Sequence, residues 1–191
     1  MKKIFFPLLF IALSLIGNSQ LIKEQAAVKK IFFDFLKFYQ KNEKKFNSFH
    51  LYKGNGKENN PPYRIQWKEA KRYFTWLRTN VHYVGEEYIR NERKHFRYSD
   101  SCFKADPDEE IPAGFDYDRW AGGQEDIAYT MKWYMDPNNK YEVIITGNKA
   151  LLRIGALGDG AEEKNRDWSI VPFVKEKGKW KMADNIYPAD E

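Results

Sequence analysis

In the first half of the chain, apolar side chains recur at three- and four-residue steps, the period of an α-helix that buries one face. The first such segment runs from Ile22 to about Phe46 and carries lysines between its apolar positions. A second runs from Gln66 to Arg78, and a third is expected to begin near Asn80, a residue type that favours the N-cap of a helix. Residues 53–62 are rich in Gly, Asn and Pro, so no packed element is expected there.

The second half of the chain changes to a period of two, which predicts half-buried β-strands. The first predicted strand covers residues 127–135, and the turn Asp136–Asn139 follows it. Further strands are expected at residues 141–146, 150–157, 168–175 and 179–183, separated by turns at Gly147-Asn148, Gly158-Asp159-Gly160 and Lys177-Gly178. Helices followed by an antiparallel meander predict an α+β protein, with the N-terminal helices packed on an antiparallel sheet of four to five strands. Trp180 and Met182 are expected on the covered face of this sheet.

The N-terminus has the pattern of a cleavable export signal. Lys2 and Lys3 precede an apolar run from Ile4 to Ile16, which is shorter than the about 20 apolar residues that a membrane span requires. Gly17 and Ser19 are small residues of the kind that signal peptidase accepts, and we place the cut after Ser19. The alternatives are an uncleaved anchor or a buried N-terminal helix. We therefore expect a signal peptide at residues 1–19 and a single domain at residues 20–191, periplasmic or secreted.

The net charge and the cysteine content limit which partners and cross-links are expected for this chain. The net charge of +5 falls to +3 when Lys2 and Lys3 are removed, which is too small a bias to imply a nucleic-acid partner. The basic segment Arg90–Tyr98 is interpreted as a solvated helix face, because helical spacing spreads its charges around the axis. Cys102 is the only cysteine, so no intramolecular disulfide can form, and we expect a buried, inert thiol.

No cofactor or metal site is expected from the motifs. His50, His82 and His95 lack ligand spacing, and no phosphate-binding glycine loop or dinucleotide fingerprint occurs. Asp116 and Asp118 alternate as calcium ligands do, but Trp120 and Ala121 stand where a third ligand and a glycine would be needed.

The densest polar group lies where a long loop, acidic at Asp106–Glu110, meets the first predicted strand. Its candidate ligand-binding residues are Asp116, Tyr117, Asp118, Trp120, Gln124 and Asp126. A carboxylate enclosed by aromatic side chains has a raised pKa and can serve as a general base. Asp residues at the start of a strand also cap turns, and this structural interpretation is favoured over catalysis.

The order of these elements resembles the nuclear-transport-factor-2-like, or cystatin-like, cone fold, in which a curved sheet wraps a long helix. The segment Val174–Met182, with Gly-Lys-Trp-Lys at its turn, is similar to the terminal strands of many secreted members. Residues Asp116–Asp126 also resemble a segment of the secreted bacterial family called domain of unknown function 3828. The chain departs from that family by having Tyr117 or Arg119 in place of a Pro, and an extra Glu125. The resemblance implies a fold more than an activity, because cone folds host enzymes, binding modules and interaction proteins.

Three hypotheses for function follow. The leading one is a non-enzymatic exported binding protein that holds a small molecule or a partner's loop at the open end of the cone, since no catalytic motif accompanies the expected aromatic concavity. The second is a small lyase, isomerase or hydrolase in which Asp116, Asp118 or Asp126 abstracts a proton. The third is an interaction module, such as an immunity protein, whose acidic loop Asp106–Glu110 plugs a basic site on a toxin. Neither nucleic acid nor a membrane span is expected, and the oligomeric state stays open.

Overall fold

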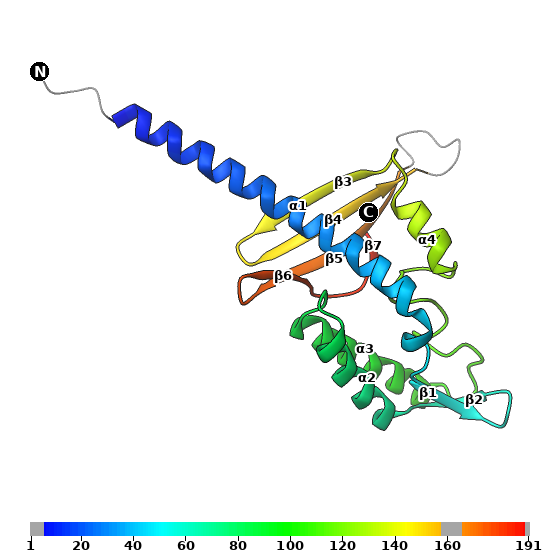
Figure 1. Ribbon diagram of the computed structural model, residues 1–191. Coiled ribbons are helices and arrows are strands. Elements are labelled where there is room, and N and C mark those ends of the chain that lie inside the picture. Colours follow the sequence, from blue (N-terminus) through cyan, green and yellow to red (C-terminus); the bar gives the residue numbers. More distant parts are fainter. Residues whose placement is uncertain (1–5, 158–165, 190–191) are drawn as a thin grey trace, which may run out of the picture.

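The chain folds into helices packed against an antiparallel sheet, with a separate two-stranded hairpin at one end (Figure 1). The computed structural model describes residues 6–157 and 166–189, with side chains from Ser19 onward. The helices are α1 (Phe6–Phe46), α2 (Trp67–Asn80), α3 (Glu86–Ala105) and α4 (Ile127–Tyr134). The strands are β1 (Tyr52–Asn55), β2 (Asn60–Ile65), β3 (Lys140–Thr146), β4 (Lys149–Ala156), β5 (Asp167–Glu176), β6 (Lys179–Met182) and β7 (Tyr187–Pro188). The predicted α+β class, with helices on an antiparallel sheet of four to five strands, is confirmed.

The main sheet is a meander in the order β3-β4-β5-β6, and the short β7 also pairs with β5. All of these pairings are antiparallel, as expected. The four strands predicted from residue 141 onward lie within two residues of the observed bounds. The predicted turn Gly158-Asp159-Gly160 lies outside the described residues.

Helix α1 lies across one face of this sheet (Figure 1). Val28, Phe32, Phe35 and Leu36 are fully buried, and their helical spacing explains why one stripe of the helix meets the sheet. The sheet contributes alternate residues to the same core, including Leu152, Ile154, Val171, Phe173 and Met182. The predicted end of this helix at Phe46 is confirmed, whereas its start is at Phe6 and not at Ile22. None of the helices in the described part of the chain is both long and apolar enough to cross a membrane.

The strand predicted at residues 127–135 is wrong, because this segment is helix α4. Ile127, Thr130 and Tyr134 are buried, at the three- and four-residue steps of a helix, while the large Tyr129 is 56% exposed. The alternation of large side chains therefore did not mark the buried positions.

Two other predictions from the first half also fail. Residues 53–62 belong to the β1–β2 hairpin, whose turn is closed by Asn59 through its side-chain acceptor for the Gly54 amide at 2.6 Å. Both strands of a two-stranded sheet are edge strands. The two adjacent prolines in β2, which lack a backbone N–H, are therefore tolerated there.

Asn80 is the last residue of α2 and does not begin the third helix. Its side-chain amide donates back to the Trp76 carbonyl, and α3 begins at Glu86.

Candidate ligand-binding cleft

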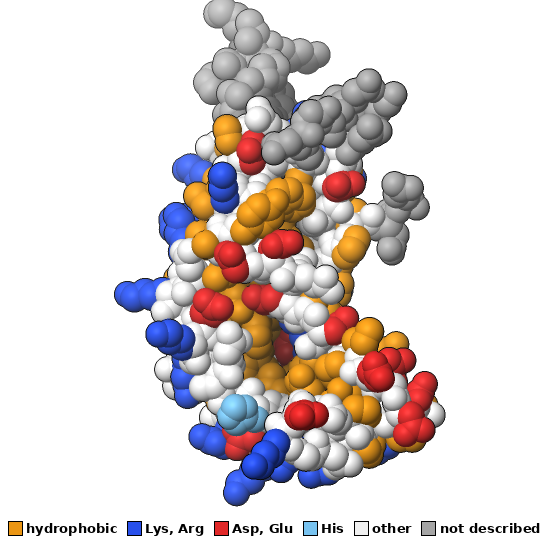
Figure 2. All heavy atoms as spheres, turned by 90° about the vertical axis from the view of Figure 1, so that its right-hand side faces the viewer, with side chains coloured by type: hydrophobic (Ala, Val, Ile, Leu, Met, Phe, Trp, Pro, Cys, Tyr) orange, Lys and Arg blue, Asp and Glu red, His pale blue; other side chains and the backbone are white. Residues whose placement is uncertain are grey.

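A cleft of about 780 Å³ opens between the C-terminal end of α1, the β1–β2 hairpin, the start of α2 and the loop that follows α3. Figure 2 shows a hollow on this side of the molecule with largely hydrophobic walls and acidic side chains around it. The four segments are far apart in sequence, so the cleft exists only in the folded chain.

Seven aromatic side chains line the cleft, together with polar and charged ones. Its aromatic lining residues are Tyr39, Phe46, Phe49, Tyr52, Phe115, Tyr117 and Trp120. The Trp120 ring centroid lies 5.1 Å from that of Phe46 and 5.5 Å from that of Tyr39, and the rings of Tyr52 and Phe115 are 5.0 Å apart. Such offset and edge-to-face contacts hold the rings in fixed orientations. The cleft therefore presents preformed apolar faces.

Asp118 fixes the loop that forms one wall. Its Oδ1 accepts hydrogen bonds from the amides of Trp120 and Ala121 at 2.9 and 3.0 Å, and its Oδ2 accepts from the Tyr39 hydroxyl at 2.7 Å. Burial, followed by the Asp118 carboxylate, raises the pKa of Tyr39 far above its usual range. Tyr39 therefore stays a neutral donor, and Asp118 joins the loop to α1.

Further carboxylates stand at the cleft. Glu43 also raises the pKa of Tyr39 by its charge, and its carboxylate has no hydrogen bond or ion pair to any described residue. Glu69 lines the cleft too, but binds the Arg72 guanidinium at 2.8 and 2.9 Å. Glu43 is thus the acceptor that remains available to an occupant of the cleft.

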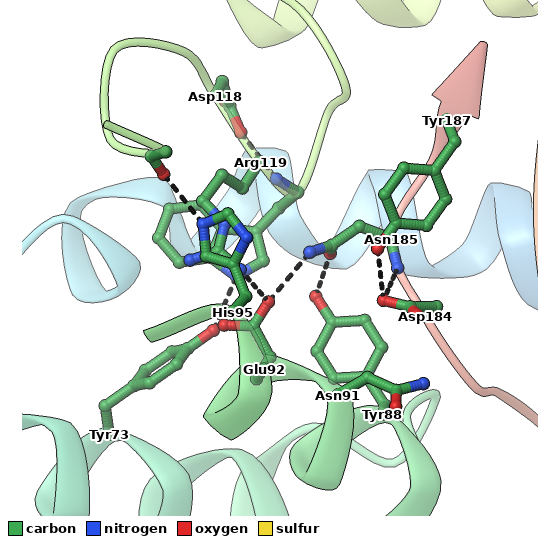
Figure 3. Close-up of polar contacts among 12 residues, drawn as sticks. Tyr73, Tyr88, Asn91, Glu92, His95, Asp118, Arg119, Asp184, Asn185 and Tyr187 are labelled. Atoms are coloured by element: carbon green, nitrogen blue, oxygen red, sulfur yellow. Dashed lines mark hydrogen bonds and ion pairs between the residues drawn. The ribbon is translucent and has the colours of Figure 1, made fainter. Parts of the chain in front are cut away.

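A buried ion pair supports the same loop from behind (Figure 3). Arg119 is 5% exposed and donates to Glu92 of α3 at 2.7 Å. Glu92 is 2% exposed and also accepts from the Asn185 side chain at 2.8 Å. The Tyr88 hydroxyl donates in turn to the Asn185 amide oxygen. Burial raises the pKa of Glu92, while the Arg119 guanidinium and the Asn185 amide act in the opposite direction.

The start of the loop is anchored by His95. Its Nε2 lies 3.2 Å from the Gly114 carbonyl oxygen, and burial, assisted by Arg119, lowers the pKa of His95 to about 4. A neutral ring protonated at Nε2 donates this bond. Gly114 has φ +77°, and a Cβ there would lie 2.4 Å from His95 Nε2, so only glycine fits.

The structure brings together half of the predicted site residues. Tyr117, Asp118 and Trp120 line the cleft. Asp116, Gln124 and Asp126 are exposed and do not line it. Sequence reasoning missed Tyr39, Glu43 and Tyr52, because aromatic and acidic residues at the end of a helix or in a hairpin look like ordinary core and surface positions.

Asp126 is the N-cap of α4, where its Oδ1 accepts from the Tyr129 amide at 2.8 Å. Asp126→Ala should lower the free energy of unfolding by about 1 kcal/mol, the usual cost of a lost N-cap. Asp126→Asn should stay near wild type, since Asn caps equally well. Urea unfolding measures both. Equal stability of the Ala variant, or loss of cleft binding in the Asn variant, would contradict the capping role.

Comparison of the chain with protein-family models, with curated proteins and with solved structures finds no match. The fold and the cleft therefore define the class by themselves: an α+β protein with an aromatic-walled cleft that presents carboxylate acceptors.

Proposed function

We propose that this chain is an exported, non-enzymatic binding protein that holds a small organic molecule in the cleft. The observation that carries the proposal is the cleft of about 780 Å³, with rigid aromatic walls and an unpaired carboxylate at Glu43. Ligand pockets generally measure roughly 300–1,000 Å³ and combine apolar walls with a few fixed polar groups. The expected export signal and the resemblance to secreted cone-fold families are consistent with this role.

The lining indicates the chemistry of the ligand. Aromatic faces such as Tyr52 and Tyr117 suit a flat ring or the apolar face of a sugar. Carboxylates accept hydrogen bonds, so the ligand must supply a donor to Glu43. A ring that carries hydroxyl or amino groups meets both requirements.

Binding is favoured over catalysis by the contacts of Asp118. A general base needs a lone pair directed at the substrate, whereas three donors already hold this carboxylate. The interaction-module hypothesis has one separate observation in its favour. Every residue of the acidic loop Asp106–Glu110 is exposed, and the Tyr63 hydroxyl holds the loop by donating to the Glu110 carbonyl at 2.8 Å.

Native mass spectrometry of protein recovered from its own cell envelope tests the proposal. We expect a polypeptide that begins at or near Gln20 and carries a retained small molecule that dissociates on activation. Full-length chain in the envelope would exclude the cleavable signal. If the recovered chain carries a bound partner protein and no small molecule, the interaction-module hypothesis would be favoured.

Glu43→Gln should weaken binding of the recovered molecule about tenfold or more, because a hydrogen bond to a charged group contributes about 1.5–3 kcal/mol. Asp108→Asn, which removes a charge from the exposed acidic loop, is the matched control and should leave affinity unchanged. Isothermal titration calorimetry measures both, and unfolding should shift by less than about 0.5 kcal/mol in either. If Glu43→Gln and the wild type bind the molecule with equal affinity, the cleft is not its binding site.

A further inference from the structure

A second, smaller groove lies between α2 and α3 and is lined by basic and aromatic side chains. It measures about 330 Å³, and its lining residues are Trp67, Lys71, Phe74, Arg93 and Arg97. No acidic residue is among them. The groove is thus a local concentration of positive charge in a chain with 32 basic and 27 acidic residues.

Other arginines on the same two helices are neutralised by neighbours. Arg72 pairs with Glu69 at 2.8 Å, Arg78 with Glu86 at 2.5 Å and Arg90 with Glu87 at 3.3 Å. Lys71, Arg93 and Arg97, by contrast, form no ion pair or side-chain hydrogen bond within the described part of the chain. The charge of Arg93 contributes to lowering the pKa of Glu86, but the Glu86 carboxylate already accepts two hydrogen bonds from Arg78. On these two helices, the arginines that lack an ion pair are therefore the two that face the groove.

Helical geometry explains why they converge. Trp67, Lys71 and Phe74 follow one another at steps of four and three on α2, and Arg93 and Arg97 are four apart on α3, so each set shares a helix face. The Arg93 guanidinium carbon lies 5.1 Å from the centroid of the Phe74 ring. Phe74 is buried, while Trp67 is 43% exposed, so the groove has an apolar floor and a cationic rim.

We infer that this groove binds a phosphate group attached to an apolar or aromatic moiety. Three cations at one depression repel one another, and an anion with several oxygens removes that repulsion while accepting the forked donors of the two arginines. Trp67 provides a ring face for the attached moiety. A Trp side chain suits this position because it combines a large apolar surface with an N–H group that can remain in contact with water. The phosphate can come from an anionic lipid headgroup or from a soluble phosphate compound.

This site is separate from the cleft. Glu69 of α2 and Gln66, which precedes that helix, line the cleft, whereas Trp67, Lys71 and Phe74 lie on a different face of α2. The inference therefore does not depend on the proposed function, and either can fail alone.

The test compares an Arg93→Gln/Arg97→Gln double variant with a matched control, Arg78→Gln/Arg90→Gln. The control removes the same amount of charge, one arginine from α2 and one from α3, at positions outside the groove. Protein expressed from the full-length sequence is titrated with pyrophosphate in a calorimeter. It is also sedimented with vesicles of phosphatidylglycerol and phosphatidylcholine, and with vesicles of phosphatidylcholine alone.

We expect the groove variant to bind at least one anionic probe about tenfold or more weakly than wild type, as expected for the loss of charge-assisted hydrogen bonds, and the control to stay within about twofold. Binding to anionic vesicles but not to pyrophosphate assigns the phosphate to a lipid headgroup, and the reverse assigns it to a soluble compound. Trp67→Ala should weaken the vesicle or ligand contact without removing the charge attraction. Absence of wild-type binding to both probes, or equal losses in the groove variant and the control, would overturn the inference.

Discussion

Replacing Arg119 with Met should lower the free energy of unfolding by about 3–5 kcal/mol, the cost of stranding one partner of a buried ion pair. The carboxylate left behind belongs to Glu92, which is 2% exposed and keeps only neutral side-chain donors, the Asn185 amide and the Tyr73 hydroxyl. The guanidinium also lies 5.2 and 5.7 Å from the ring centroids of Phe96 and Phe115, so packing is lost with the charge. Urea or thermal unfolding measures the effect.

Two variants separate this cause from a general defect. Glu92→Gln together with Arg119→Met removes both charges and should recover part of the lost stability, because no unpaired carboxylate remains. Arg72→Met breaks a surface pair with Glu69 and should cost at most about 1 kcal/mol. A double variant as unstable as the single one would show that the charge pair is not the cause.

Trp180→Ala should also cost about 3–5 kcal/mol, the range for deleting a large buried aromatic side chain. Trp180 is 5% exposed and lies on the covered face of β6, beside the fully buried Met182. The Lys175 ammonium, held by Glu24 of α1 at 2.7 Å, lies 5.3 Å from the Trp180 ring centroid. The ring thus fills space where α1 meets the sheet.

Trp180→Phe is the informative comparison. The buried Trp180 Nε1 makes no hydrogen bond of normal geometry, although the indole lowers the pKa of the nearby Glu24, so replacing it by a smaller ring sacrifices at most a weak contact. We expect a loss of under about half that of the Ala variant, since most of the apolar volume is retained. Near-wild-type stability of Trp180→Ala would mean that this face of β6 is not core.

The periodic parts of the fold were predictable from sequence alone. The spacing of Val28, Phe32, Phe35 and Tyr39 predicts the buried stripe of α1, and this stripe is almost completely inaccessible to solvent. The strands β3 to β6 follow from alternation and from Gly turns such as Lys177-Gly178, where Gly178 has φ +78°. The core position of Trp180 and Met182 follows from the same alternation. These features depend on residues that are close in sequence.

Segments with two compatible patterns were decided by tertiary packing. Residues 127–135 carry large side chains at every second position, but burial selects Ile127, Thr130 and Tyr134 and makes the segment a helix. The signal for this outcome was Asp126, an N-cap residue just before the helix. The hairpin at residues 52–65 gains its register from pairing with itself and from contact with α3, which its Gly, Asn and Pro content does not encode.

The candidate sites divide in the same way. The sequence determined that Tyr117, Asp118 and Trp120 form a polar and aromatic cluster, because they are consecutive or nearly so. Only the tertiary structure could join Asp118 to Tyr39, 79 positions earlier, and Arg119 to Glu92. The same holds for Lys71 of α2, which meets Arg93 and Arg97 of α3 at one groove. Periodicity fixes which face of an element is buried, but the partner of that face is set by the packing of the whole chain.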